Sequence, residues 1–170
     1  NWNISLIAGE EMVTRDILEK KMFDNAEQRT GRRRLSIDVA VQGKDNCIMV
    51  GWDGLHIDRL DSYPKFSDDE AIRSAVRRTM DSQNVLSPDM YFDAIGNGVC
   101  LSSLGGFGIQ AKATPLNEGA FGILKDQIMW TLGDLIIKGK ISIDDTLLYK
   151  KIEYGSRGKV TVREIILEEM

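Results

Sequence analysis

The chain has 170 residues, of which 42% are hydrophobic and 28% are charged, and its formal net charge is −4. These values predict a folded, soluble protein with one compact domain, or one domain with an appended arm. A negative net charge argues against a general nucleic-acid coat, which needs excess Lys and Arg to neutralise phosphates, and no apolar run approaches the ~18 residues that a membrane span requires.

The N-terminal part is expected to form an arm and a helix, residues 1–34. Trp2–Ala8 is short and apolar, which is compatible with an edge strand or a docking arm. Glu10–Arg29 has apolar residues at helical spacing and should be a helix that ends at Gly31. Because Asn1 is not a natural start, we expect that processing or trimming removed residues before it, and that the product is intracellular.

Three consecutive arginines follow this helix: Arg32, Arg33 and Arg34. Such a run can bind phosphate, but no aromatic residues are interleaved with it. A solvated or partner-facing turn is therefore the favoured interpretation.

The next segment predicts β-structure. Leu35–Gln42 alternates between apolar and polar residues, and Cys47–Gly51 returns after a polar turn, so 35–51 reads as an antiparallel hairpin. Leu55–Leu60 is a short third strand that carries His56, the single histidine. With no Ser or Cys nucleophile beside it, this histidine is interpreted as structural.

The cysteines Cys47 and Cys100 lack metal-ligand spacing. We predict two buried free thiols, with a disulfide between them as the alternative.

The clearest helix is Ser67–Met80. Ser67 and Glu70 match a capping box, in which each side chain accepts a hydrogen bond from the other residue's backbone. None of its residues has an evident chemical task, so this helix predicts a scaffold.

Asp81–Gly108 is expected to be a long loop. Its GNG and GGFG runs do not match phosphate-binding loops, so the glycines are interpreted as permitting positive φ or close backbone approach. Loops of this length are usually functional or ordered by a partner.

The C-terminal part predicts a second helix and a second hairpin. Asn117 is placed to cap a helix over Glu118–Lys138, from whose apolar line Trp130 departs as a partner anchor or a core residue. Ile141–Glu153 and Val160–Leu167 read as two paired strands.

Together these elements predict an α+β fold. Two β-hairpins should form a small, mostly antiparallel sheet packed against two main amphipathic helices, with an N-terminal helical arm. Residues 35–170 would then be a single α+β domain, which the resemblance described next implies to be wedge-like.

The order of these elements resembles the small baseplate wedge protein family of contractile-tailed phages, with relatives in contractile injection systems. The matching stretches are Ser67–Met80, Pro88–Leu104, Ile123–Ile137 and Ile141–Leu167. The chain departs from the family at the turn after the second helix, where the family has Glu-Pro-Arg and this chain has Lys-Gly-Lys. It also lacks the family's GER-containing run between the helices.

The resemblance implies a structural, sheath-initiator-like role and no enzymatic activity. The chain would join the baseplate to the tail sheath by adding foreign strands to a sheet edge and by helix packing. Its partners would be other wedge and sheath proteins, in several copies around a tail tube. The expected location is the virion tail baseplate, after assembly in the host cytoplasm.

No catalytic residue, metal site or cofactor is expected, and nucleic acid and membranes are not expected partners. The predicted partner-binding residues are Val160, Val162, Glu164, Ile166, Ile141, Ile143, Trp130, Arg32, Arg33 and Arg34.

Three alternatives remain open from the sequence. The chain could be another tail or virion adaptor, tube or terminator protein that binds its partners by the same sheet-edge and helix contacts. It could be a nucleic-acid-binding regulatory module that uses Arg29 and Arg32–Arg34. It could also be a carboxylate- or metal-dependent hydrolase that uses the only evident acidic constellation: Asp53, Asp58, Asp61, Asp144 and Asp145.

Overall fold

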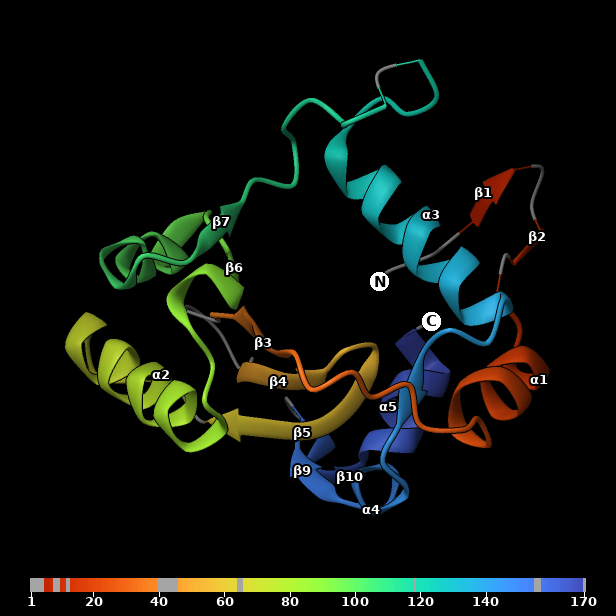
Figure 1. Cartoon of the computed structure of the whole chain (residues 1–170), viewed down its shortest axis with the longest axis horizontal. Coiled ribbons are helices and arrows are strands. Elements are labelled where there is room, and N and C mark those ends of the chain that lie inside the picture. The colour runs from red at the N-terminus through yellow and green to blue at the C-terminus, as the bar shows by residue number, and fades with distance from the viewer. Residues whose placement is uncertain are drawn as a thin grey trace.

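The centre of the protein is a six-stranded mixed sheet, seen in a computed structural model that describes residues 5–7, 10–11, 13–39, 46–63, 66–117, 119–154 and 157–169. The strand order is β7-β6-β3-β4-β5-β8 (Figure 1). The strands are β3 (Arg33–Asp38), β4 (Cys47–Asp53), β5 (His56–Tyr63), β6 (Met90–Asp93), β7 (Phe107–Ile109) and β8 (Ser142–Ile143).

Both pairing directions occur in this sheet. The strands β3, β4 and β5 are antiparallel neighbours, whereas β6 runs parallel to β3, β7 parallel to β6, and β8 parallel to β5. Parallel neighbours bring the carboxyl ends of β3 and β6 to the same edge, which matters for the site described below.

The helices lie on both faces and at the ends of the sheet (Figure 1). They are α1 (Arg15–Leu18), the π-helix η1 (Glu19–Phe23), α2 (Asp69–Gln83), the 3-10 helices η2 (Ser87–Asp89) and η3 (Gly96–Leu104), α3 (Leu124–Ile137), α4 (Asp145–Leu148) and α5 (Val162–Glu169). Two small two-stranded pairs complete the fold: β1 (Ser5–Ile7) with β2 (Glu10–Glu11), and β9 (Lys151–Glu153) with β10 (Lys159–Thr161).

One face of the sheet is closed by α2 and η3. The alternation of β3 buries Leu35 and Ile37 on this face, where they meet Met49 of β4, Val76 of α2 and Leu101 of η3. Each of these five side chains is at most 4% exposed, so this face is a filled core.

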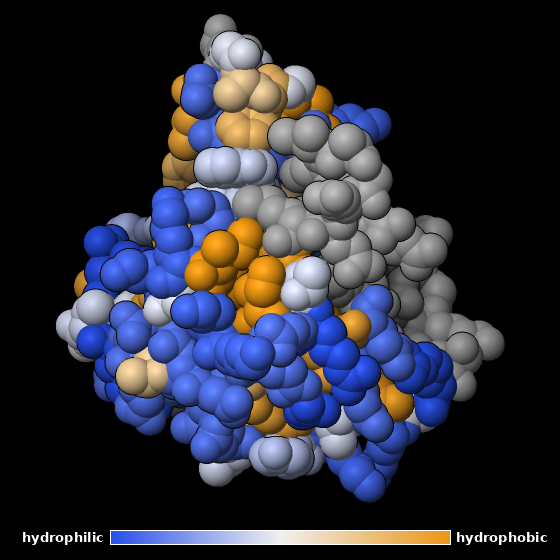
Figure 2. Space-filling model, turned by 90° about the vertical axis from the view of Figure 1, so that its right-hand side faces the viewer, coloured by the Kyte–Doolittle hydropathy of each residue, from blue (hydrophilic) through white to orange (hydrophobic). Residues whose placement is uncertain are grey.

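The other face carries a second core that is displaced toward β5 and β8. It gathers buried side chains from α1, η1, α3, β8, α4 and α5, among them Leu18, Ile136, Ile141 and Val162. On the side of the molecule seen in Figure 2, the lower part is mainly hydrophilic, and hydrophobic side chains lie at the centre and on the upper projection. Every described helix is too short or too polar to span a lipid bilayer.

The predicted α+β class is confirmed, but the predicted layout of two hairpins is not, because six strands form one mixed sheet with parallel pairs. The predicted strands 35–42, 47–51 and 55–60 correspond to β3, β4 and β5. The structure describes the first of them only to residue 39.

The predicted C-terminal hairpin is wrong in its larger part. Only β9 and β10 pair, as a separate short ribbon, and Val162–Glu169 is the helix α5 rather than a strand. The stretch Ile141–Glu153 divides into β8, α4 and β9, because Asp144 accepts a hydrogen bond from the N–H of Thr146 and thereby caps α4.

The helices also differ from prediction at their ends. The N-terminal helix ends at Phe23 instead of Gly31, after a π-helical segment. Asp68, not Ser67, caps α2 by accepting from the N–H of Ala71, and α3 begins at Leu124 without the predicted Asn117 cap.

The largest omission is inside the predicted loop 81–108, which contains η2, β6, η3 and β7. The interpretation of its glycines is confirmed: Gly96 and Gly105 have positive φ, and a Cβ on Gly98 would lie 1.7 Å from the carbonyl oxygen of Asp93. The prediction of two buried free thiols is confirmed for Cys47, whereas Cys100 is free but only partly buried.

Candidate active site

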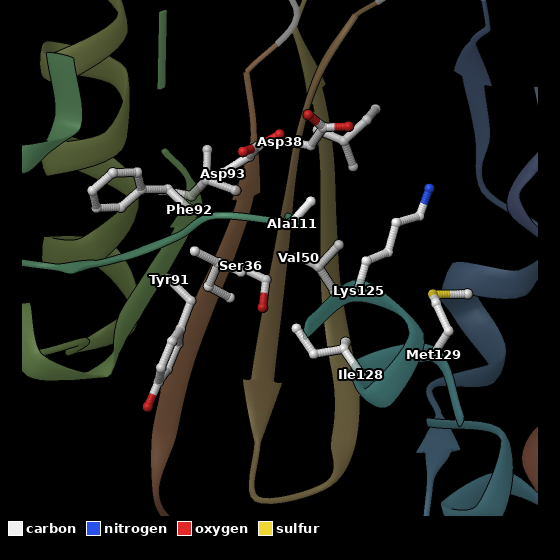
Figure 3. A pocket seen from close by; sticks show the side chains of 13 residues that line it. Ser36, Asp38, Val50, Tyr91, Phe92, Asp93, Ala111, Lys125, Ile128 and Met129 are labelled. Atoms are coloured by element: carbon white, nitrogen blue, oxygen red, sulfur yellow. The ribbon is translucent and has the colours of Figure 1, made fainter. Parts of the chain in front are cut away.

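Two aspartates end two adjacent parallel strands of the sheet. In the β3–β6 ladder Ser36 faces Tyr91 and Ile37 faces Phe92, so the next positions along the strands are Asp38 and Asp93. Neighbouring strands lie about 5 Å apart. The two carboxylates therefore sit side by side, on the face opposite α2, and both residues are exposed (Figure 3).

These aspartates line a cavity of about 320 Å³ between the sheet and α3. The sheet contributes Ser36 of β3, Ile48 and Val50 of β4, and Tyr91 of β6, while Ile128 points in from α3 (Figure 3). The remaining lining residues are Ile37, Phe92, Ile109, Ala111, Lys125 and Met129. The cavity thus has an acidic end and mainly apolar walls.

Local structure fixes the position of Asp93. Its Oδ1 accepts a hydrogen bond of 3.0 Å from the N–H of Ile95, which turns the chain directly after the strand. The backbone of Gly98 packs against the carbonyl oxygen of Asp93, closer than any side chain would permit. Gly98 of the GNG run therefore allows the chain to pass close to the backbone that carries the aspartate.

The start of α3 is tied to the sheet edge beyond β7. The backbone N–H groups of Leu124 and Lys125 donate to the carbonyl oxygens of Ala113 (2.8 Å) and Ala111 (3.0 Å). Lys125, Ile128 and Met129 are spaced three and four residues apart, so they share the helix face that looks into the cavity. A lysine ammonium is thereby placed in the same cavity as the two aspartates.

A second group of acids lies at the opposite end of β3. Asp58 accepts hydrogen bonds from Arg33 (3.0 Å to Nη2) and from Arg29 (3.1 Å to Nη1), and Asp53 lies within 4.0 Å of the same two arginines. Burial acts to raise the pKa of Asp53. The backbone N–H groups of Thr30 and Gly31 and the nearby arginines outweigh it and hold that pKa below the ordinary value.

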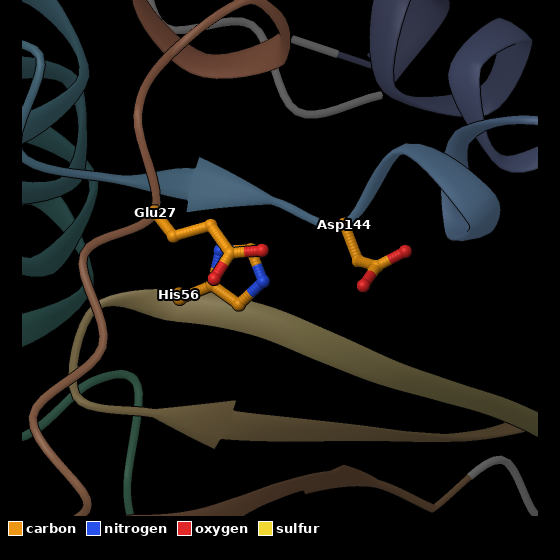
Figure 4. A group of neighbouring side chains, drawn as sticks. All are labelled: Glu27, His56 and Asp144. Atoms are coloured by element: carbon orange, nitrogen blue, oxygen red, sulfur yellow. The ribbon is translucent and has the colours of Figure 1, made fainter.

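A third group joins Glu27, His56 and Asp144, whose ligand-type atoms lie within 4.8 Å of one another (Figure 4). The guanidinium of Arg29 is already among them, 3.0 Å from Nε2 of His56, 2.7 Å from Glu27 and 3.7 Å from Asp144. Because a guanidinium can only donate, Nε2 is the acceptor and the ring proton is assigned to Nδ1, which faces Oγ of Ser142 at 2.8 Å. These contacts form an ion-pair and hydrogen-bond network around Arg29, and the structural role predicted for the histidine stays a prediction.

Three acids of the predicted hydrolase constellation, Asp53, Asp58 and Asp144, come together around the guanidinium of Arg29, at 3.9, 3.1 and 3.7 Å. The other two, Asp61 and Asp145, do not contact Arg29. Asp53 and Asp58 pair with arginines, and Asp61 pairs with Arg59 at 2.6 Å. Asp144 caps α4, and Asp145 is an exposed residue of its first turn.

The predicted partner-binding residues are scattered. Ile141, Ile143 and Val162 are buried in the second core. Val160 lies on β10, and Glu164 and Ile166 lie on α5, so these residues do not form one sheet edge. Their partner-binding role stays untested.

The other predicted contact residues also have partners within the chain. Trp130 is 39% exposed, and its ring centroid lies 5.9 Å from that of Phe121. Arg32 pairs with Asp89 at 2.7 Å, Arg33 pairs with Asp58, and Arg34 donates to the carbonyl oxygen of Gly54. The arginine run is thus largely neutralised by the fold.

Sequence reasoning did not single out Asp93, and it noted Asp38 only as a polar position of a strand. A usable signal was present in both cases: an apolar strand ends in an aspartate, in LSID for β3 and in MYFD for β6. Recognising the second strand was the missing step.

No protein-family model and no curated protein matches the chain. Solved structures do match. The nuclease domain of the large terminase subunit gp2 of bacterial virus Sf6 has a TM-score of 0.65 at 15% identity, covering 79% of this chain and 74% of that chain. A mutant of that domain with manganese and beta-thujaplicinol has a TM-score of 0.64 at 13% identity, covering 94% and 92%.

The fold is that of large terminase nuclease domains. This finding corrects the resemblance to baseplate wedge proteins, which rested on the order of common elements and on a C-terminal strand that is a helix. The inferences drawn from that resemblance fail with it: the structural sheath-joining function, the absence of enzymatic activity, the wedge and sheath partners, the exclusion of nucleic acid and the location in a tail baseplate.

Proposed function

We propose that the chain is a metal-dependent nuclease that cleaves DNA, of the kind found in phage large terminases. One observation carries the proposal: Asp38 and Asp93 end adjacent parallel strands on the same face and open into one cavity. The shared fold with domains that are titled nucleases supports it. As a phage protein of this kind, the chain would act in the cytoplasm of the host.

The chemistry of the donors fits a divalent metal ion. Carboxylate oxygens are the ligands preferred by Mg²⁺ and Mn²⁺, and such ions are often held by one or two carboxylates together with water and substrate phosphate oxygens. Asp38 and Asp93 supply that pair, and their exposure leaves room for a phosphate. The mutant Sf6 domains were solved with calcium and with manganese, which agrees with an oxygen-rich site in that protein.

In this site a bound divalent ion would polarise the scissile phosphate and favour deprotonation of an attacking water molecule. Asp38 and Asp93 hold their carboxylates on strands rather than on loops, so the charge that binds the ion is preorganised. Lys125 supplies a positive charge in the same cavity, where it can orient a DNA phosphate.

The chain must bind DNA despite its net charge of −4. Its arginine run is engaged in contacts within the chain, so phosphate binding would depend on the metal ion and on Lys125, the one lysine among the described residues that line the cavity. DNA affinity should therefore be modest and should respond less to salt than that of a strongly basic protein.

The test is cleavage of linear DNA in MgCl₂ or MnCl₂, with EDTA as the metal-free control. We expect metal-dependent cleavage by the wild type and loss of cleavage in Asp93→Asn. Asp145→Asn is the matched control, because it removes an exposed carboxylate of the acidic set proposed from sequence without touching the cavity. Equal cleavage by wild type and Asp93→Asn, or a loss confined to Asp145→Asn, would contradict the assignment.

A further inference from the structure

The proposed metal site does not explain why the walls of the active-site cavity are mainly apolar. A phosphate would need only a metal ion held at the acidic end and a nearby positive charge, yet the cavity extends away from Asp38 and Asp93 over Ile48, Val50 and Ile128. An exposed apolar hollow of about 320 Å³ beside a catalytic pair is typical of a ligand pocket.

The positions of the polar and apolar groups define what would fit. Ser36 lies two residues before Asp38 on the same face of β3, which places it about 7 Å from the acidic end. An occupant must therefore carry a phosphate at one end and an uncharged, largely apolar group of limited size at the other. A nucleotide meets both conditions.

Side chains that can contact a nucleobase line the apolar part of the cavity, away from the two aspartates. Tyr91 is half-buried and lines the cavity, and its ring is supported from outside by Phe107, with centroids 6.3 Å apart. Met129 offers a polarizable thioether, which makes favourable contacts with aromatic rings. Bases stack on aromatic side chains without regard to sequence.

A hydrogen-bond donor is also present on the cavity floor. Oγ of Ser36 accepts from Nε1 of Trp52 at 3.2 Å. Within the part of the chain that the structure describes, this hydroxyl donates no hydrogen bond, so its hydrogen can be donated to an acceptor on a base.

We propose that this cavity receives the unstacked base of the nucleotide next to the scissile phosphate, so that the enzyme acts on unpaired or locally opened DNA. This inference rests on the proposed nuclease function and adds the class of substrate. In a regular duplex the base faces are covered by their neighbours, and extruding a base costs a few kcal/mol. Single strands and mismatched positions avoid that cost.

The first arm of the experiment measures cleavage by the full chain in MnCl₂. The substrates share one sequence: a single strand, its duplex, the duplex with one mismatch, and the single strand with one abasic site moved along it. We expect faster cleavage of the single strand than of the duplex, enhanced cleavage beside the mismatch, and a loss of about tenfold at the bond beside the abasic site, the size of one lost stacking contact.

Pocket-filling variants extend this arm. Ala111→Leu and Ile109→Phe each add volume to the cavity wall from different positions, so one remains informative if the other fails to fold by circular dichroism. Both should lose the preference for single strands. Leu116→Phe is the matched control, because Leu116 is 89% exposed and is not among the residues that line the cavity.

The second arm measures binding without cleavage, so that a failure of the nuclease proposal can be told apart. A trinucleotide with 2-aminopurine and a trinucleotide lacking that base are titrated into wild type and Ala111→Leu with MnCl₂. Tighter binding of the base-containing probe to wild type alone supports the pocket even if no DNA is cleaved. Equal binding of the two probes, or equal cleavage of all the substrates, overturns the inference. The two probes would bind equally if the protein's own chain filled the cavity.

Discussion

Two groups of aspartates at opposite ends of β3 have the same chemistry and different surroundings. Asp53 and Asp58, with side chains about 15% and 14% exposed, sit against Arg29 and Arg33 and hold the sheet to the segment before it. Asp38 and Asp93 are exposed and open into a cavity. We infer that acids packed between arginines stabilise this fold and that acids at the open strand ends serve its chemistry.

The largest expected effect separates activity from stability at the open end. Asp38→Asn should lower the rate of DNA cleavage by about a hundredfold or more, because the metal ion contributes several kcal/mol of transition-state stabilisation. Asp38 takes part in an interaction within the chain, but interactions of exposed charges contribute only about 0–1 kcal/mol, so the free energy of unfolding in urea should change by no more than about 1 kcal/mol. If Asp38→Asn lowered the free energy of unfolding in proportion to its loss of cleavage, the distinction between the two groups of aspartates would not hold.

The next effect tests the support of Asp93 by the glycine run. Gly98→Ala places a Cβ 1.7 Å from the carbonyl oxygen of Asp93, so the backbone that carries the aspartate must shift. A shift of about 1 Å can cost a hundredfold in rate, and we expect a loss of cleavage between tenfold and that value. In Gly119→Ala the added Cβ meets nothing within 4 Å, so this control should cleave DNA like the wild type.

For the arginine-paired aspartates at the other end of β3, we expect a loss of stability without a loss of cleavage. Asp58→Asn removes the carboxylate that accepts from Arg29 and Arg33, and should lower the free energy of unfolding by about 1–3 kcal/mol. The cleavage rate of the folded fraction should stay unchanged. Urea denaturation and cleavage assays on the same preparation measure both quantities, and a selective loss of cleavage would move the active site to this end.

The smallest effect is a pH dependence of the same group. Because the pKa of Asp53 is lower in the folded than in the unfolded chain, its carboxylate stabilises the fold above the ordinary pKa of about 3.9, and that contribution is lost as pH falls through the folded value. The stability difference between wild type and Asp53→Asn should therefore be constant from about pH 7 to 5 and shrink below about pH 4. A difference that grew on acidification would show that the carboxylate is not stabilised by its partners.

Local patterns predicted the local parts of this fold well. The apolar–polar alternation of 35–42 predicted β3, and the apolar stripe of Ser67–Met80 predicted α2. Each element has one buried face, and this face produces the spacing of apolar residues in the sequence. The same reasoning failed for Val160–Leu167, whose β-branched residues favour a strand but whose side chains pack as a helix in the second core. The division into an arm of residues 1–34 and a domain of residues 35–170 stays a prediction.

The proposed active site could not be predicted from the sequence because it depends on a non-local pairing. Asp38 and Asp93 lie far apart in the chain and meet only because β6 inserts beside β3 in parallel. The strand β6 has four residues, too few for a clear period, and it stands between a proline-containing turn and a glycine run that both indicate a loop. Four of the five acids that the sequence did single out, Asp53, Asp58, Asp61 and Asp144, lie within 4.0 Å of an arginine of the same chain.

The most direct test of the central claim is the location of a bound Mn²⁺ ion, measured by paramagnetic broadening of backbone NMR signals in the intact chain. We predict selective broadening at the ends of β3 and β6, around Asp38 and Asp93, and loss of that broadening in Asp93→Asn. Broadening centred instead on Glu27, His56 and Asp144, or an unchanged pattern in Asp93→Asn, would contradict the account.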